Sequence, residues 1–422
     1  MTKARTLSAA ALWLSLAGTA GALGLPGLTA ADAARVPAPP APERPRRPAP
    51  ADWTVMVYLN AKNNLEEFGL KDLNELEAAG STDRVSIVAE LGRMKGYYAG
   101  DGDWTGVRRY YVTRDADRGA VTSPVLADLG PADMGDYREL AAFIRWAKAS
   151  YPARKYLLVV WNHGSGWTKS AAGPRGISYD DESGSHITVR QLAQALRETG
   201  GADVYASDAC LMQMPEVAWE LRDLASYIVG SEETEPADGY PYDAVLAALT
   251  AAPGMAPRAL AGELVSDYGA YYASQGTGAT LSALDASALP RLRELTAAFA
   301  EAAMAAGDRG VMKRGLYYAQ HYAYDDNKDL GSFLDYVAAK ARDQRLRGAA
   351  AALAAHLRGP LVPFRAAANY AQVPDGLEPA DYGLASGLAV YLPGTRPPAA
   401  YAELSWAADS SWGAFLAWLT GK

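Results

Sequence analysis

The sequence has very few of the residues that cross-link an exported domain or hold a metal ion. Its 422 residues include one cysteine, Cys210, and four histidines. A single cysteine excludes an internal disulfide, so stability must come from packing or from bound ions. No Cys/His cluster has the spacing of a zinc site. No cysteine follows the apolar start of the chain, which excludes a bacterial lipoprotein anchor.

Positive charge is scarce as well. The chain carries 40 Lys and Arg against 48 Asp and Glu, which gives a formal net charge of −8. Binding to nucleic acid needs clustered positive charge, so we expect no nucleic-acid partner. A preference for basic substrates suits an acidic chain, although a solvated acidic surface is the commoner reason for such a charge. The sequence also contains no internal repeat and no Walker-type phosphate loop.

The amino terminus has the pattern of a secretory signal peptide. Lys3 and Arg5 precede an apolar run over residues 7–25, and small residues suited to cleavage follow it. We therefore expect a signal peptide over residues 1–33, with an uncleaved membrane anchor as the alternative. Residues 34–51 are rich in Pro and Ala and predict a linker or a removable pro-segment. The expected product is secreted or periplasmic, with no stable membrane association after cleavage.

The remaining chain alternates between strand-like and helix-like patterns. Strands separated by helices of this length predict βαβ units and a mostly parallel sheet, here over residues 52–252. After Pro253 the chain becomes Ala-rich and helical, with a late strand at residues 387–392. We expect an α/β core over 52–252 and a helix-rich C-terminal region over 253–422 packed on that core.

Two of the expected strands end in reactive side chains. His163 closes the apolar run 156–162, and Cys210 follows the strand-like run 202–206. Catalytic groups gather at the carboxyl ends of strands in parallel sheets, so this pair suggests a thiol nucleophile with its acid/base partner. The alternative is that Cys210 is a small buried apolar residue.

Three segments carry a resemblance to a known family. They are Trp-Asn-His-Gly-Ser-Gly-Trp at 161–167, Asp-Ala-Cys-Leu-Met at 208–212, and an acidic, Pro- and Tyr-containing stretch at 232–242. Together they resemble the clostripain family of secreted cysteine endopeptidases, over about residues 53–418. The resemblance implies a caspase-like α/β fold, a three-layer sandwich with a mostly parallel central sheet. The segment Gln213-Met214-Pro215 departs from the family pattern, in which small residues are more usual.

A peptide bond needs an activated nucleophile, an acid and oxyanion donors. His163 is expected to supply positive charge near the Cys210 thiol and to protonate the amine leaving group. The backbone N–H groups of Gly164 and Cys210 are the candidate oxyanion donors. The caspase-like fold implies that His163 and Cys210 need not form a tight pair before substrate arrives.

Substrate preference is expected to depend on nearby carboxylates. Asp208 lies two residues before Cys210, so in a strand both side chains project to the same side. The resemblance implies that Asp208 lies at the floor of the specificity pocket and that Asp238 adds a second carboxylate. Such a pocket would select polypeptides with Arg or Lys before the cleaved bond. The alternatives are a helix cap for Asp208 and a plain turn for Asp238.

The connection over residues 168–185 separates His163 from Cys210. The resemblance implies that such a loop can be cut by the enzyme itself, for which Lys169 and Arg175 are the candidates, whereas the alternative is an uncut surface loop. The acidic run at 180–182 suggests a structural calcium or, alternatively, a solvated face. The chemistry itself requires no cofactor, and we expect a monomer.

Two other functions remain open. Ser165 prompts a serine hydrolase, but the nucleophile elbow needs Gly two positions earlier, where this chain has His163. A catalytically silent binding protein of the same fold is the second, since a fold does not guarantee activity. The other histidines, His186, His321 and His356, are expected to be exposed or structural.

Overall fold

The computed structural model describes residues 50–167, 176–371 and 381–421. They belong to one compact unit that begins at Arg46. The expected signal peptide, nearly all of the Pro-rich stretch, and both processing candidates, Lys169 and Arg175, lie outside the described residues.

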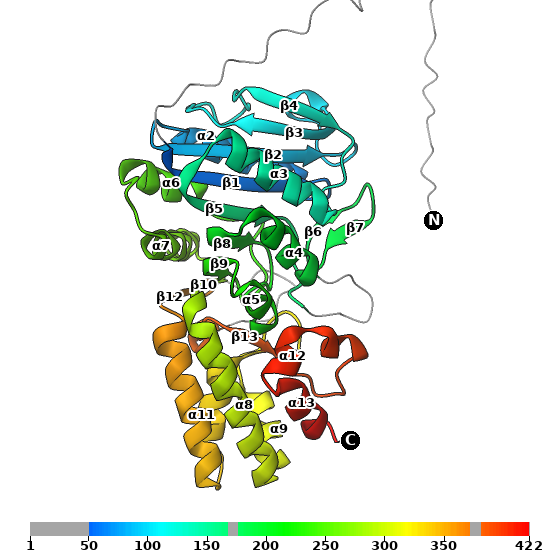
Figure 1. Cartoon of the computed structure of the whole chain (residues 1–422), viewed down its shortest axis with the longest axis vertical. Helices are drawn as coiled ribbons and strands as arrows, with labels where there is room; N and C mark the ends of the chain where they lie inside the picture. The colour runs from blue at the N-terminus through cyan, green and yellow to red at the C-terminus, as the bar shows by residue number, and fades with distance from the viewer. Residues whose placement is uncertain (1–49, 168–175, 372–380, 422) are drawn as a thin grey trace, which may run out of the picture. The chain divides into compact units, whose positions relative to one another are not determined.

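A nine-stranded sheet forms the centre of this unit, in the order β12-β10-β9-β8-β5-β1-β2-β3-β4 (Figure 1). Five consecutive strands are parallel, namely β1 (Ala51–Ala61), β2 (Val85–Arg93), β5 (Ala153–Trp161), β8 (Ala202–Asp208) and β9 (Ala225–Gly230). Antiparallel strands flank them on both sides, namely β3 (Gly106–Tyr111), β4 (Val125–Gly130), β10 (Ala279–Asp285) and β12 (Phe364–Ala368). The mostly parallel sheet expected from the sequence is confirmed.

Helices cover both faces of this sheet, which explains why its inner strands are almost continuously apolar. On one face the buried residues come from α2 (Glu66–Ala79), α6 (Tyr242–Ala251) and α7 (Pro257–Gln275). On the other face they come from α3 (Tyr137–Ser150), α4 (Val189–Thr199) and α5 (Pro215–Leu221). Thr188 caps α4, in a reciprocal capping box with Gln191. These layers are the three-layer sandwich that the sequence predicted.

The C-terminal region adds helices and a small sheet. The helices are α8 (Leu289–Ala306), α9 (Arg309–Tyr318), α10 (Leu330–Lys340), α11 (Gln344–His356), α12 (Ser405–Asp409) and α13 (Trp412–Leu419). The small sheet consists of β11 (Asn327–Asp329) paired with β13 (Ala389–Tyr391). Outside this region, β6 (Ile177–Asp180) pairs with β7 (Ser185–Ile187) in another two-stranded sheet. The buried side chains of these helices continue the core beneath α3, α4 and α5.

The expected division at residue 252 does not separate the sheet from the later chain. Strands β10 and β12 both follow residue 253, yet both belong to the central sheet, with Ser282 of β10 opposite Gly230 of β9. Their sequences are rich in Ala and give little strand signal, so pairing with an existing edge overrides local propensity. The late strand expected at 387–392 is β13, which lies outside the central sheet. Within the described residues, we find no helix with the length and apolar character needed to cross a bilayer.

Candidate active site

The pairing of β5 with β8 brings His163 and Cys210 to the same edge of the sheet. In this register Trp161 lies opposite Asp208, and each reactive residue follows two positions later. The backbones then come into close contact, because an ideal Cβ built on Gly164 would lie 2.4 Å from the carbonyl oxygen of Cys210. Position 164 therefore requires glycine, and the predicted meeting of the two segments is present in the structure.

The Cys210 thiol is mostly buried and lies among backbone N–H groups. The N–H of Glu235 donates to its sulfur at 3.2 Å. Burial raises the pKa of the Cys210 thiol and the Glu233 carboxylate adds to this, while the N–H groups of Glu235, Cys210 and Gly164 oppose it. The resting thiol is therefore protonated at neutral pH. The two N–H groups expected to hold an oxyanion, those of Gly164 and Cys210, are close enough to act on this sulfur.

Leu211, the residue after the cysteine, has a strained backbone. Its φ is 64°, a left-handed conformation that costs a branched residue on the order of 1–3 kcal/mol. The side chain is buried, and the Leu211 N–H donates to the Glu233 carbonyl at 3.0 Å. The loop after β9 therefore holds this turn in place, and such overdetermined strain is typical of functional sites.

The His163 ring has a partner that the sequence analysis missed. Its Nε2 lies 2.8 Å from the Oδ1 atom of Asn64, in the loop that follows β1. An amide oxygen only accepts hydrogen bonds, so Nε2 carries the proton and Nδ1 is left with a free lone pair. Burial lowers the pKa of His163, against an opposing effect of Asp181. The imidazole is therefore neutral at neutral pH. Because β1 is the neighbour of β5, an Asn at the end of β1 was the available signal.

The segment around His163 is fixed by β6. Asn162 accepts a hydrogen bond from the Tyr179 N–H at 2.7 Å, and the Ser165 N–H donates to the Gly176 carbonyl at 3.0 Å. Ser165, which precedes the connection, and Gly176, which lies within it, are therefore held beside the histidine.

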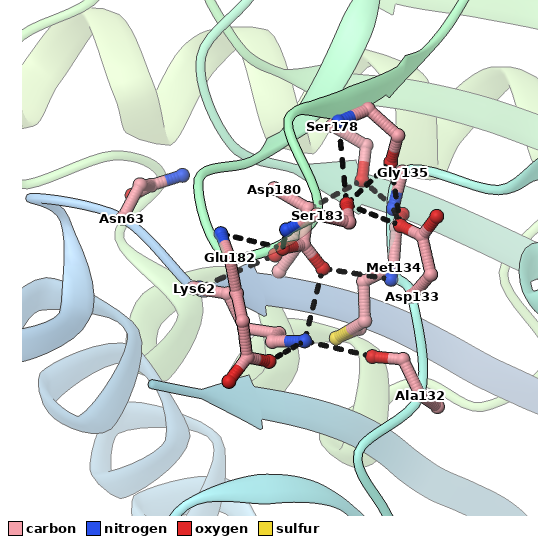
Figure 2. Close-up of polar contacts among 12 residues, drawn as sticks. Lys62, Asn63, Ala132, Asp133, Met134, Gly135, Ser178, Asp180, Glu182 and Ser183 are labelled. Atoms are coloured by element: carbon pink, nitrogen blue, oxygen red, sulfur yellow. Dashed lines mark hydrogen bonds and ion pairs between the residues drawn. The ribbon is translucent and has the colours of Figure 1, made fainter. Parts of the chain in front are cut away.

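The acidic run considered for calcium contacts a lysine (Figure 2). Lys62 Nζ lies 3.1 Å from Asp180 Oδ2 and 2.5 Å from Glu182 Oε2, and donates to the Ala132 carbonyl at 2.8 Å. The third acidic residue, Asp181, accepts from the Tyr97 hydroxyl at 2.9 Å. In the part of the chain that the structure describes, no three His, Cys, Asp or Glu side chains are grouped to hold a metal ion.

Asp208 is buried at the end of β8. Its Oδ2 accepts from the Tyr242 hydroxyl at 2.6 Å and from the Tyr240 N–H at 3.2 Å. The helix-cap alternative is wrong, because Met214 occupies the N-cap of α5 and no side chain caps that helix. Burial raises the pKa of Asp208, and these hydrogen bonds oppose the shift.

Asp238 lies nearer the surface. Its Oδ1 accepts from Lys71 Nζ at 2.6 Å, and its Oδ2 accepts from the Tyr271 hydroxyl at 3.3 Å. A turn is present here, since the Gly239 N–H donates to the Pro236 carbonyl at 3.0 Å and Gly239 has a φ of 61°. Backbone groups therefore form the turn, whereas the Asp238 carboxylate contacts Lys71 and Tyr271.

Two further carboxyl groups lie beside Asp208. An ideal Cβ on Gly239 would lie 3.0 Å from Asp208 Oδ2 and 3.3 Å from Asp72 Oδ2. Burial and the charge of Asp208 raise the pKa of Asp72 and that of Glu235 well above the ordinary value. Glu235 belongs to the acidic segment singled out in the sequence. Asp72 is on α2, and nothing in the local sequence links it to Cys210.

Ser165 and the other histidines have structural contacts. The Ser165 hydroxyl is buried, lies 2.7 Å from the Tyr179 hydroxyl and accepts from the Gly176 N–H at 3.1 Å. His186 stacks on Tyr179 with ring centroids 5.2 Å apart. His321 Nδ1 lies 2.9 Å from Lys328 Nζ, and His356 Nε2 lies 3.0 Å from the Ala288 carbonyl oxygen.

Comparison with known proteins identifies the family of this chain. The family model of the clostripain family matches residues 57–353. Clostripain from Hathewaya histolytica is 28% identical over 225 residues, which cover 48% of this chain and 43% of that protein, less than half its length.

Solved structures show the same fold. An inactive zymogen C11 protease from Parabacteroides distasonis has a TM-score of 0.66 at 21% identity, covering 86% of this chain and 99% of that one. A secreted C11 cysteine protease from Bacteroides thetaiotaomicron, in complex with an irreversible peptide inhibitor, has a TM-score of 0.64 at 21% identity with the same coverage of both chains. The matched family model shows that the chain belongs to the clostripain family of cysteine peptidases, and the solved structures share its caspase-like fold.

Proposed function

We propose that this protein is a secreted cysteine endopeptidase that cleaves polypeptides after Arg or Lys, with Cys210 as nucleophile and His163 as acid and base. The observation that carries the proposal is the pairing of β5 with β8, which brings the two residues to the same edge of the sheet. The N–H groups of Gly164 and Cys210 lie beside the thiol, where an oxyanion would form.

Because the Cys210 thiol and the His163 imidazole are both uncharged at rest, the thiol proton is transferred during the attack on the substrate. The thiol proton passes to Nδ1 of His163 as sulfur attacks the carbonyl carbon, and the carbonyl oxygen becomes an oxyanion held by the two N–H groups. The C–N bond then breaks, and the leaving amine takes the proton from Nδ1. Water hydrolyses the thioester, with His163 as the base. Asn64 keeps the proton on Nε2 throughout, which leaves Nδ1 for the reaction.

The basic-residue preference rests on the carboxyl cluster. Asp208 and Glu235 are buried against each other, and burial of neighbouring carboxyl groups is costly unless they are protonated or meet a cation. An Arg or Lys side chain entering beside Cys210 supplies that cation through charge-assisted hydrogen bonds. Asp238 is the second, more exposed carboxylate.

Other features of the protein follow from the same proposal. Export agrees with the expected signal peptide and with the secreted relative from Bacteroides thetaiotaomicron.

The reaction needs no cofactor, because thiol, imidazole and backbone N–H groups supply each step. Lys62 already pairs with both Asp180 and Glu182, which argues against a calcium ion at that run. We propose that the enzyme acts as a monomer.

The connecting loop over residues 168–185 is a candidate for self-cleavage at Lys169 or Arg175. The residues before it include β1 and β5, and those after it include β8, which pairs with β5. A cut in this loop would leave two fragments that share one sheet. The fragments are therefore expected to stay associated until the protein is denatured.

The first prediction tests the nucleophile. Cys210→Ala and His163→Ala are each expected to abolish hydrolysis of fluorogenic Arg and Lys peptides, because the thiol or the leaving-group acid is lost. Ser165→Ala is the matched control for the serine-hydrolase alternative and is expected to stay active. Activity above a trace in Cys210→Ala would refute the thiol mechanism, and an inactive wild-type chain on all peptides would favour a silent binding protein.

The second prediction concerns Asn64, whose side chain is exposed. Asn64→Ala is expected to lower kcat by about tenfold to a hundredfold with little change in KM, part of the 10²–10⁴-fold that a positioned acid or base contributes. Asn64→Asp places a negative charge beside Nε2 and favours the imidazolium, so the acidic limb of the kcat/KM profile should move to higher pH. An unchanged pH profile in both variants would mean that Asn64 does not act on His163.

The third prediction tests specificity. Asp208→Asn keeps the size of the side chain and removes its charge. It is expected to cost about 2–5 kcal/mol with basic peptides. That is a loss of roughly thirtyfold to several-thousandfold in kcat/KM. Peptides with Leu before the cleaved bond serve as the control and should lose far less. An equal loss for basic and neutral peptides would assign Asp208 a purely structural role.

The fourth prediction concerns maturation. Purified wild-type protein is expected to run as two fragments on a denaturing gel and as one species in size-exclusion chromatography, with a new amino terminus after Lys169 or Arg175. Cys210→Ala should remain a single chain. Fragments of the same size from Cys210→Ala, prepared without other proteases, would show that the cut is not autocatalytic.

A further inference from the structure

Helix α2 brings a lysine to the carboxyl cluster. Lys71 Nζ lies 2.6 Å from Asp238 Oδ1 and 3.8 Å from Glu75 Oε1. The next residue, Asp72, approaches the backbone of Gly239, where the Asp208 carboxylate also lies. Lys71 therefore contacts Asp238 of this loop, and the Asp208 carboxylate lies beside the next residue of the loop, Gly239.

The ionisable side chains around this loop are nearly all acidic. Asp72, Asp208 and Glu235 are buried, and Glu75 and Asp238 lie further out. Within the described ranges, Lys71 is the only basic side chain within 4.0 Å of any of these five carboxyl groups. The Tyr272 hydroxyl experiences the charges of Asp208, Glu235 and Asp238 together, which places these three in one electrostatic environment.

The Lys71–Asp238 pair is accessible and can be displaced. The two side chains are 40% and 43% exposed. Ion pairs at such exposure contribute little to stability, because solvent screens them and ordering long side chains costs entropy. A cationic side chain arriving from solvent can therefore replace Lys71 as the partner of Asp238.

We propose that Lys71 is an internal competitor of the substrate's basic side chain, which occupies Asp238 in the free enzyme and thereby sets the strength of the Arg/Lys preference. The proposal rests on the specificity site proposed above. In the free enzyme Lys71 neutralises Asp238, so an incoming cation first meets a weaker field. When that cation binds, Lys71 turns to solvent and Asp238 pairs with the substrate.

The experiment compares Lys71→Met, Asp238→Asn and the double variant, using Arg, Lys and Leu peptides at low and high salt. Lys71→Met is expected to raise kcat/KM for basic peptides by roughly twofold to fivefold at low salt, the size of an exposed ion pair. The gain should shrink as salt rises. The Leu peptide should be unaffected. In the Asp238→Asn background the same substitution should give no gain, because the competition is for Asp238.

A matched control removes one positive charge elsewhere. Arg291→Met breaks the exposed Arg291–Glu294 pair on α8 and should leave all three peptides unchanged. The proposal is overturned if Lys71→Met leaves or lowers kcat/KM for basic peptides, raises it equally for Leu, or gives its full gain in the Asp238→Asn background. Failure of the specificity site itself is distinct, because Asp208→Asn would then also leave the preference for basic peptides intact.

Discussion

The parallel pairing of β5 with β8 is the constraint on which the site depends. The register runs from Leu157 opposite Val204 to Trp161 opposite Asp208, and the Asn162 N–H extends it by donating to the Asp208 carbonyl at 3.2 Å. A slip by one residue would exchange the faces of every side chain in strands that are buried on both sides. It would also move His163 by about 3.3 Å relative to Cys210. The cores on the two faces of the sheet therefore fix the catalytic geometry.

Burial controls the charge state of the whole site. It raises the pKa of Cys210 and lowers the pKa of His163, so both reactive groups rest uncharged. It also raises the pKa of Asp72 and Glu235, which with Asp208 form a cluster that is costly to ionise without a cation. The same low-dielectric surroundings therefore favour an uncharged resting site and would strengthen the attraction between these carboxyl groups and the proposed basic substrate.

The sequence predicts those parts of the protein whose signal is local. The apolar runs that end at His163 and before Cys210, and the alternation of strand-like and helix-like segments, all lie within short windows. Strands β10 and β12 were missed because their small residues form strands only by pairing, β10 with β9 and β12 with β10. Contacts such as Asn64 with His163, 99 residues apart, and Lys71 with Asp238, 167 residues apart, follow from the order of the strands and not from any nearby pattern.

The two reactive residues are supported by different parts of the chain, which explains why the catalytic unit extends beyond residue 252. His163 is held by β1 and β6, through Asn64 and Tyr179. The Cys210 turn is held by the loop after β9, and that loop is held by late residues. The Gly387 N–H donates to Glu232 Oε2 at 3.0 Å, and the Ala389 N–H donates to the Gln213 carbonyl at 3.0 Å. The left-handed Leu211 needs such support to persist. The C-terminal region is therefore part of the framework that orients Cys210, the proposed nucleophile.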